Sequence, residues 1–538
     1  MFELAHLTNL EELDLSDNYF NDTPSIQECM RLSRLKKLKS IRLQSNEFNK
    51  SILSCLGALP SLKTLDLSIN KLGGSFPIQA VEITSLGPGS VDSILDYPGS
   101  KPCGSKWSYP GSGWPSGRYS TRPTRISRVP EWIPDREQLS CLSQDLEVLL
   151  LSGNDFNGTL SFEALASFHH LEVLDLGYNN FVGSIPSTIQ ELSSLRVLSF
   201  AHNNLNGPLP DHGLCELKNL QELDLSHNMF NGSVPQCFNR LSSLAILDIS
   251  SNRFTGTLTP SPIANLTSLE YVDFGDNLFQ GSFRFSSLSN NTMLELVRFM
   301  SNNSKFEVET EEPTGWIPMF QLKVLVISGC SMNRPKGRNI PRFLLHQHEL
   351  QEIDLSDNSL VGPFPNWLIE SNTMLEYLIL SKNSFSGIIR MPFYVNANIR
   401  WLDMSGNHLN GTIPDDIQKF LPGIRYLNLS SNSLDGVISS SIGDMRELWA
   451  LDLSDNKFSG EVPKGLFSNL FGLSILKLSN NRLQGQVLSR NLSLGYITLL
   501  HLDNNCFTGK IGNVNISNSR LQRLDIGSNS FRGMIPIG

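Results

Sequence analysis

The sequence predicts an α/β solenoid, a right-handed superhelix with a parallel β-sheet on the concave face and short 3₁₀ or irregular turns on the convex face. The pattern L-x-x-L-x-L-x-x-N recurs nineteen times, mostly every 24 or 25 residues, and Gly follows the closing Asn by four residues in fifteen repeats. One coil cannot bury its own leucines, so the coils must stack. Nineteen coils in phase form one elongated body, not the three or four domains that 538 residues otherwise suggest.

Each repeat begins with a short predicted strand, for example LEELDLSDN at 10–18 and LWALDLSDN at 448–456. Side chains alternate along a strand, so the leucines five and three residues before the closing Asn point inward, and the residues six, four and two before it point outward. The amide of the closing Asn, here called the ladder Asn, carries donors and an acceptor for the backbone where the strand ends. Cys330 takes this place in one repeat, and we expect a buried, unreactive thiol.

The second half of each repeat is predicted to turn without a long helix. The Gly after the ladder Asn permits a backbone conformation that side chains resist, and a following Pro, such as Pro186 or Pro414, ends any ladder. This L-x-G-x-I-P tail resembles the extracellular leucine-rich repeat domains of plant receptor-like proteins and receptor-like kinases. Residues 214–237 and 302–330 resemble segments of the receptor-like proteins, the branch without a kinase.

The resemblance implies a ligand-recognition ectodomain on the extracellular face of the plasma membrane. It would bind a peptide, protein or glycan-derived ligand on its concave or lateral surface and signal through a partner leucine-rich repeat receptor-like kinase, in defence or development. Two alternatives stay open: the ectodomain fragment of a receptor-like kinase, and a secreted inhibitor of a cell-wall-degrading enzyme. The chain has neither a recognisable signal peptide nor a run of 18 apolar residues, so membrane attachment is implied only through segments missing from it.

The repeats are interrupted once. The ladder asparagines Asn70 and Asn154 lie 84 residues apart, which leaves about 60 residues beyond one repeat. We therefore divide the chain into first repeats at 1–86, a Gly/Pro/Ser-rich insertion at 87–145, and remaining repeats at 146–538, truncated at the C-terminus. The insertion is read either as a loop or disordered segment or as a gene-model artefact such as a translated intron.

No catalytic constellation is found. The chain lacks a phosphate-binding loop, a zinc-protease motif, a nucleophile elbow and the kinase signatures, so we expect no enzyme activity and no cofactor or metal. The net charge of −9, without a basic stripe outside the insertion, also disfavours nucleic acid as a partner.

Departures from the repeat pattern mark a candidate binding surface. Three successive repeats place an aromatic residue six positions before the ladder Asn, and three place Arg or Trp one position earlier. Exposed aromatics beside Arg are the residue types that anchor interfaces. The alternative is that neighbouring aromatics only stack on one another. The candidate ligand-binding residues are Tyr377, Arg400, Trp401, Arg425, Tyr426 and Trp449.

Covalent chemistry fits an oxidising compartment. Cys215 with Cys237, and Cys29 with Cys55, are spaced to bridge neighbouring coils as disulfides. A further N-x-S/T sequence at Asn302 is discounted because this Asn belongs to the ladder. The predicted N-glycosylation sites are Asn21, Asn49, Asn157, Asn231, Asn265, Asn290, Asn410, Asn428, Asn491 and Asn515.

Overall fold

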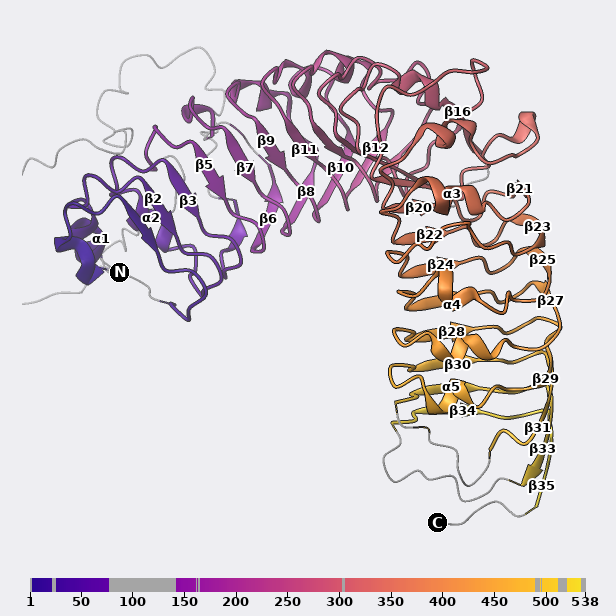
Figure 1. The fold of residues 1–538 in the computed structure, drawn as a ribbon. Helices are drawn as coiled ribbons and strands as arrows, with labels where there is room; N and C mark the ends of the chain where they lie inside the picture. The colour runs from indigo at the N-terminus through magenta and orange to yellow at the C-terminus, as the bar shows by residue number, and fades with distance from the viewer. Residues whose placement is uncertain are drawn as a thin grey trace, which may run out of the picture. The chain divides into compact units, whose positions relative to one another are not determined.

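The computed structural model describes residues 2–21, 26–76, 142–160, 162, 165–301, 305–488, 494, 496–510 and 520–533 (Figure 1). The chain forms two compact units, Met1–Leu220 and Gln221–Gly538. Each contains two kinds of parallel strand. Ladder strands precede the ladder Asn, and lateral strands follow it.

In the residues that the structure describes, the first unit contains six ladder strands, four lateral strands and short helices. Its ladder strands are β1 (Glu12–Asp14), β2 (Ser40–Arg42), β3 (Thr64–Asp66), β5 (Val148–Leu150), β7 (Val173–Asp175) and β9 (Val197–Ser199). Its lateral strands are β4 (Gly73–Ser75), β6 (Asp155–Thr159), β8 (Asn180–Gly183) and β10 (Asn204–Pro208). Its helices are α1 (Ile26–Leu32), α2 (Ile52–Leu56) and the 3₁₀ turns Phe2–His6, Leu165–Ser167, Ser187–Glu191 and Leu214–Glu216.

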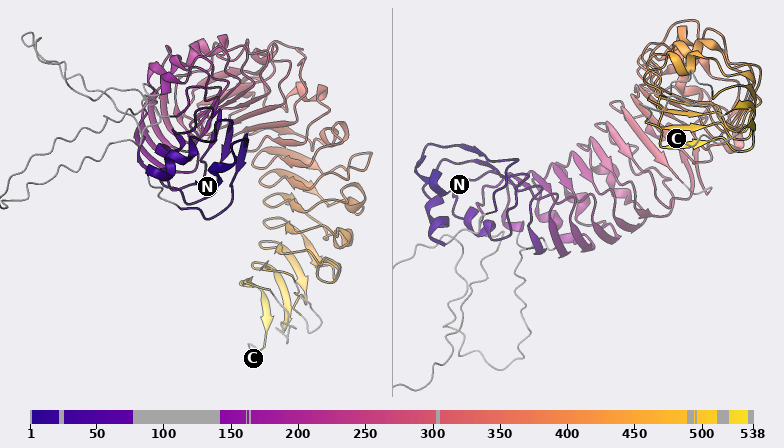
Figure 2. Two further views of the ribbon diagram at one scale, coloured as in Figure 1. Left: turned by 90° about the vertical axis from the view of Figure 1, so that its left-hand side faces the viewer. Right: turned by 90° about the horizontal axis from the view of Figure 1, so that it is seen from below.

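The described part of the second unit contains thirteen ladder strands, which pair with one another in chain order (Figure 2). They are β11 (Glu222–Asp224), β13 (Ile246–Asp248), β15 (Tyr271–Asp273), β17 (Leu296–Met300), β19 (Val324–Ser328), β20 (Glu352–Asp354), β22 (Tyr377–Ile379), β24 (Trp401–Asp403), β26 (Tyr426–Asn428), β28 (Ala450–Asp452), β30 (Ile475–Lys477), β32 (Leu499–His501) and β34 (Arg523–Asp525).

The remaining elements of the second unit are short lateral strands and helices. The lateral strands are β12 (Met229–Gly232), β14 (Arg253–Phe254), β16 (Gly281–Arg284), β18 (Phe306–Glu309), β21 (Val361–Gly362), β23 (Ser384–Ile388), β25 (His408–Gly411), β27 (Ser433–Leu434), β29 (Ser459–Glu461), β31 (Arg482–Gly485), β33 (Cys506–Lys510) and β35 (Ser530–Arg532). The helices are α3 (Asn366–Ser371), α4 (Ile417–Phe420), α5 (Gly465–Ser468) and the 3₁₀ turns Gln236–Arg240, Phe285–Leu288, Arg334–Lys336, Arg342–His346 and Ser440–Asp444.

The predicted fold class is confirmed. Neighbouring ladder strands pair in parallel, as in Trp401 opposite Tyr426. The leucines at the two inward positions are buried in the inner coils, as Leu427 and Leu429 illustrate, whereas Leu13 and Leu15 are half-buried and Leu524 is exposed in the first and last described coils. Each of the fifteen glycines four residues after a ladder Asn has a positive φ, for example 84° at Gly183. The convex side therefore turns through 3₁₀ segments and short helices, as the Gly and Pro positions predict.

The ladder Asn does what its chemistry predicts. Nδ2 of the buried Asn179 donates to the carbonyl oxygens of Leu151, Leu176 and Gly177 at 3.0, 3.1 and 2.9 Å. Its Oδ1 accepts from the Phe156 N–H of the preceding coil at 3.1 Å. One amide thus satisfies four backbone groups and joins two coils.

Cys330 substitutes for the ladder Asn as a buried thiol. Its Sγ lies 3.3 Å from the Phe299 carbonyl oxygen and 3.2 Å from that of Ser328. Burial raises the pKa of the thiol, so the sulfur stays protonated and unreactive. This agrees with the role expected from the sequence.

The predicted insertion does not separate the coils that flank it. Strand β3 pairs directly with β5, in the register Thr64 opposite Val148 and Leu65 opposite Leu149. Of the predicted segment 87–145, only residues 142–145 belong to the described ranges, so the nature of the insertion stays a prediction.

Candidate functional site

The six candidate binding residues lie on or immediately before four successive strands, β22, β24, β26 and β28. Tyr377 is opposite Trp401, and Trp401 is opposite Tyr426. One position earlier, the Arg425 N–H donates to the Arg400 carbonyl at 2.8 Å, and the Trp449 N–H donates to the Arg425 carbonyl at 2.7 Å. We call these six residues the aromatic–arginine patch. The repeat brings all six together on adjacent coils, three of them on the strands and three immediately before a strand.

Two of the aromatic rings stack on each other. The ring centroids of Trp401 and Tyr426 lie 3.6 Å apart with an interplanar angle of 8°. The alternative interpretation, that neighbouring aromatics stack on one another, therefore applies to this pair. Each ring covers one face of the other. Tyr377 and Trp449, by contrast, are 40% and 47% exposed. The patch therefore has a rigid aromatic centre and two accessible aromatic flanks.

The two arginines are held in different ways. Nη1 of Arg400 donates to the Gly423 carbonyl at 3.0 Å. A Cβ on Gly423 would lie 2.2 Å from that nitrogen, so the absent side chain makes room for the guanidinium. Arg425 faces Glu447 at 3.6 Å, but both side chains are more than half exposed, and such a pair contributes little. Both guanidinium groups keep N–H donors for a ligand.

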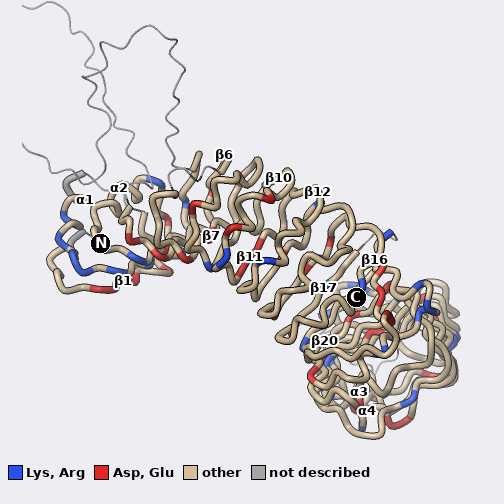
Figure 3. Tube along the Cα trace, turned by 90° about the horizontal axis from the view of Figure 1, so that it is seen from above, with Lys and Arg blue, Asp and Glu red and all other residues tan. Residues whose placement is uncertain are grey.

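The row that holds these arginines, seven positions before the ladder Asn, elsewhere pairs opposite charges between neighbouring coils. Those pairs are Lys39 with Glu11 at 2.7 Å, Lys63 with Glu147 at 2.5 Å, Arg196 with Glu172 at 3.2 Å and Lys323 with Glu295 at 2.6 Å. At the patch two arginines are neighbours, and within the described ranges Arg400 forms no ion pair. Basic and acidic residues are interspersed over each unit (Figure 3). Other like-charged neighbours occur in the same row, such as Lys39 beside Lys63 and Glu147 beside Glu172, and Glu376 precedes Arg400 in it.

Polar side chains next to the stacked rings form hydrogen bonds with one another. Nδ2 of Asn428 donates to Asp403 Oδ2 at 3.1 Å and to the Tyr426 hydroxyl at 3.2 Å. Burial, followed by the charge of Asp403, raises the pKa of Tyr426, so its phenol stays protonated. Because this oxygen accepts from Asn428, its own O–H is left to donate elsewhere.

The same contacts correct one glycosylation prediction. Asn428 is 9% exposed, and its Oδ1 accepts from the N–H and hydroxyl of Ser430 at 3.1 and 2.7 Å. The prediction of a glycan here is wrong, because a buried amide with both ends hydrogen-bonded offers no room for a sugar. The sequence motif arises because Asn replaces the Asp of the repeat pattern on the sheet.

A second cluster on the same unit was missed by the sequence analysis. The Tyr271 hydroxyl donates to Asp248 Oδ2 at 3.1 Å, and the buried Asp273 lies opposite Asp248 on the next strand. Burial, with a smaller contribution from Asp248, raises the pKa of Asp273 to about 6. Arg298 is opposite Asp273 but reaches Glu352, at 3.9 Å. The signals were present in the sequence as an aromatic and an Arg at outward positions of the pattern.

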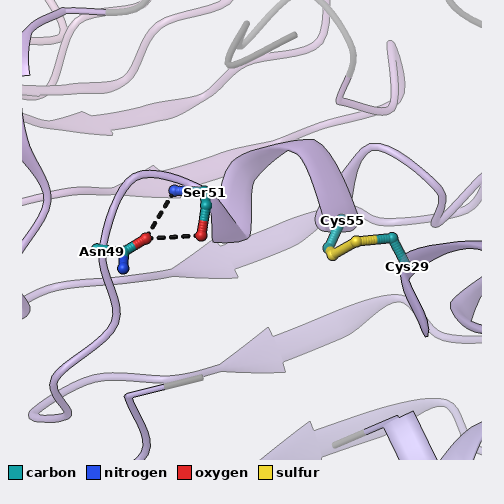
Figure 4. The surroundings of a disulfide bond; sticks show 4 residues. All are labelled: Cys29, Asn49, Ser51 and Cys55. Atoms are coloured by element: carbon teal, nitrogen blue, oxygen red, sulfur yellow. Dashed lines mark hydrogen bonds between the residues drawn. A yellow bond between two sulfur atoms is a disulfide. The ribbon is translucent and has the colours of Figure 1, made fainter. Parts of the chain in front are cut away.

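The other predicted glycan acceptors differ in exposure. Asn49 is half-buried, and its Oδ1 accepts from the Ser51 N–H at 3.0 Å and hydroxyl at 2.6 Å (Figure 4). Asn491 and Asn515 lie outside the described residues. The exposed acceptors are Asn21, Asn157, Asn231, Asn265, Asn290 and Asn410. Their glycosylation stays a prediction.

Disulfides are present where the cysteine spacing places them. Cys29 of α1 and Cys55 of α2 are bonded, with Cα atoms 4.4 Å apart (Figure 4). Cys215 and Cys237 are each disulfide-bonded as well. Within the described ranges, Cys330 is a buried free thiol and Cys506 an exposed one.

Two findings, on metal sites and on membrane-spanning helices, apply to the described ranges only. No group of three or more His, Cys, Asp or Glu side chains is arranged to hold a metal ion there. None of the helices there combines the length and apolar character needed to cross a membrane.

Comparison with known proteins identifies the class. Family models described as leucine-rich repeat region and leucine-rich repeat match residues 151–381 and 411–458, and a third leucine-rich repeat model matches 9–29 and 398–420. The chain therefore belongs to the leucine-rich repeat proteins. Within that class, segments of the chain are similar to plant receptor-like proteins.

Receptor-like protein 13 of Arabidopsis thaliana is 43% identical over 105 residues, which are 20% of this chain and 9% of that protein. Receptor-like protein 1 of Arabidopsis thaliana is 40% identical over 116 residues, 22% of this chain and 10% of that protein. The matches thus span about a tenth of each relative's own length.

Solved structures share the fold. The structure of PEPR1 with AtPEP1 gives a TM-score of 0.65 at 26% identity and covers 99% of this chain and 68% of that one. The structure of the Arabidopsis receptor kinase HAESA with the peptide hormone IDA and the co-receptor SERK1 gives 0.59 at 23% identity, covering 98% of this chain and 84% of that one.

Proposed function

We propose that this chain is a non-enzymatic ligand-recognition region of a plant cell-surface receptor-like protein, and that it binds a peptide or protein ligand on the aromatic–arginine patch. The observation that carries the proposal is the grouping of two neighbouring arginines with aromatic side chains on four successive coils, where Tyr377 and Trp449 are 40% and 47% exposed. Guanidinium groups with N–H donors to spare can bind an anionic ligand group. Arg and large aromatics are also the side chains that dominate interface energies.

The geometry favours a peptide that carries a carboxylate as the ligand. It is less suited to a sugar ring that stacks by its face on the aromatic rings. Trp401 and Tyr426 each cover one ring face of the other, so ring edges contribute much of what the pair offers a ligand. Aromatic edges are electropositive. The phenol O–H and two guanidinium groups add donors beside them. A ligand rich in acceptors matches this set.

Similar proteins support the partner classes. The relatives are receptor-like proteins, and the similar PEPR1 was solved with AtPEP1. HAESA, which has the same fold, was solved with a peptide hormone and a co-receptor. We accordingly propose that the chain acts on the extracellular face of the plasma membrane and signals through a leucine-rich repeat receptor-like kinase.

The test is a binding screen with the purified chain immobilised on a sensor surface. The probes are synthetic peptide libraries with either a free C-terminal carboxylate or a C-terminal amide. For the tightest peptides, Trp401→Ala with Arg425→Ala is expected to weaken binding by about 30-fold or more, since a central interface residue contributes about 2 kcal/mol.

The matched control is Arg390→Ala with Tyr394→Ala, which removes an exposed Arg and an exposed Tyr of the same unit outside the patch. Its affinity is expected to equal that of the unchanged protein. Equal losses in both double variants, or none in either, would overturn the assignment of the patch.

A further inference from the structure

Most residues immediately before a ladder Asn are held in the left-handed region of backbone space. The N–H of such a residue donates to the next coil, as at Tyr178, where the acceptor is the Ala201 carbonyl at 2.8 Å. Most of these positions hold Asp, Ser, Asn or Gly, which tolerate a positive φ. The bulkier exceptions are Ile69, Tyr178, His202, His227 and Lys382. Tyr178, with φ 51°, is strained there because its side chain is bulky, and its aromatic ring offers a surface that a ligand can use.

One face of the Tyr178 ring is covered and the other is open. Its centroid lies 4.1 Å from that of His202 on the following coil, with the rings 16° from parallel. The opposite face therefore points toward the preceding coil, where the equivalent residue is Gly153, without a side chain. A Cβ added to Gly153 would have only Ile69 atoms among its three nearest neighbours. Tyr178 is 60% exposed, and Ile69 is 55% exposed.

The coil of Gly153, which precedes the coil of Tyr178, also carries a glycan acceptor. Asn157, of the sequence Asn-Gly-Thr, is exposed on β6, and its Cα pairs with that of Asn180 on β8. Tyr178 lies two residues before Asn180. The N–H of Asn154, three residues before Asn157, donates to the Tyr178 carbonyl at 3.2 Å, so Asn157 and Tyr178 lie on directly adjacent coils.

We propose that the open face of Tyr178 is the docking surface for the first N-acetylglucosamine of an N-linked glycan on Asn157. The carbon-bound hydrogens of a sugar ring are attracted to the negative face of an aromatic ring. The contact offsets the backbone strain at Tyr178 and holds the glycan against the lateral sheet. This inference rests on the proposed extracellular function, because N-glycans are attached in the secretory pathway.

The chain contains two internal controls with the same backbone geometry. Asn231 of β12 pairs with Arg253, and Asn410 of β25 pairs with Ser433. Both are exposed acceptors in the same position of the repeat. The residues that correspond to Tyr178 are Ser251 and Ser431, with φ 51° and 53°. A glycan at these two sites has no ring to stack on.

The test is a double-mutant cycle on the whole chain secreted from plant cells, with glycan occupancy measured by peptide mapping and stability by thermal unfolding. Asn157→Gln is expected to lower the Tm by about 2 °C in the otherwise unchanged protein, and by nothing when Tyr178→Ser is present. In the glycan-free Asn157→Gln protein, Tyr178→Ser is expected to raise the Tm because it relieves the strain. Asn231→Gln is the control, and its effect is expected to be independent of Tyr178.

The failures are distinguishable. If Asn157 carries a glycan and the cycle shows no coupling, or if Asn231 and Asn410 are occupied and Asn157 is not, the Tyr178 inference is wrong while the proposed function stands. If none of the three sites is occupied, the extracellular assignment itself is wrong, and the inference falls with it.

Discussion

Replacement of the ladder residue Asn179 by Ala is predicted to cost about 4 kcal/mol of local stability. The change leaves the buried N–H of Phe156 without an acceptor and three carbonyl groups without their amide donor. A buried donor left unpaired costs about 1–3 kcal/mol, and each lost hydrogen bond to a carbonyl costs about 0.5–1.5 kcal/mol, part of which water recovers. The sum is a large fraction of a typical folding free energy.

The assay is hydrogen exchange of peptides that cover residues 151–160, because the Phe156 amide reports on the lost bond directly. The matched control is Asn180→Ala, which removes the same side chain from the next, exposed position and is expected to change stability by less than about 0.5 kcal/mol. Protection that falls equally in both variants, or in neither, would refute the role of the ladder amide.

Two further predictions concern single groups. Asp273 has a folded-state pKa of about 6, above its ordinary 3.8, so its ionisation destabilises the fold progressively as the pH rises from about 4 to 6. Asp273→Asn should therefore stabilise the protein by up to about 3 kcal/mol at pH 7.5 and by almost nothing at pH 4, as followed by thermal unfolding. The matched control is Asp175→Asn, which removes a half-buried carboxylate that accepts the same kind of backbone bond; equal pH curves for the two variants would contradict the reasoning. The Cys29–Cys55 disulfide closes a loop between cysteines 26 residues apart. The double replacement of both cysteines by Ser should destabilise the first unit by about 3 kcal/mol, and reducing agent should then have no further effect at this bond.

The fold could be predicted because its determinants recur locally. Inward leucines such as Leu427 and Leu429 are buried for the same reason in coil after coil, and ladder asparagines such as Asn179 and Asn203 serve equivalent backbone groups. Because the same structural requirement recurs in successive coils, the residues that meet it recur at a fixed spacing in the sequence. The composition of the aromatic–arginine patch was predictable for the same reason, since strand register follows from the repeat.

What could not be predicted depends on contacts between coils that the repeat pattern does not encode. Asn428 matches a glycan acceptor, yet Asp403, 25 residues earlier, and Tyr426 hold its amide. The raised pKa of Asp273 depends on how deeply its neighbours bury it. The open face of Tyr178 depends on which side His202 stacks. In each case side-chain orientation decides the outcome.

The central claim, that the aromatic–arginine patch receives the ligand, is tested most directly by photo-crosslinking. The tightest carboxylate-bearing peptide from the library screen, carrying a photoreactive group, is irradiated with the whole chain, and the crosslinked residues are mapped by mass spectrometry. The account predicts crosslinks within residues 377–379, 400–403, 425–428 and 449–452 and their loss with Trp401→Ala and Arg425→Ala. Crosslinks that lie outside these residues and persist in the double variant would contradict it.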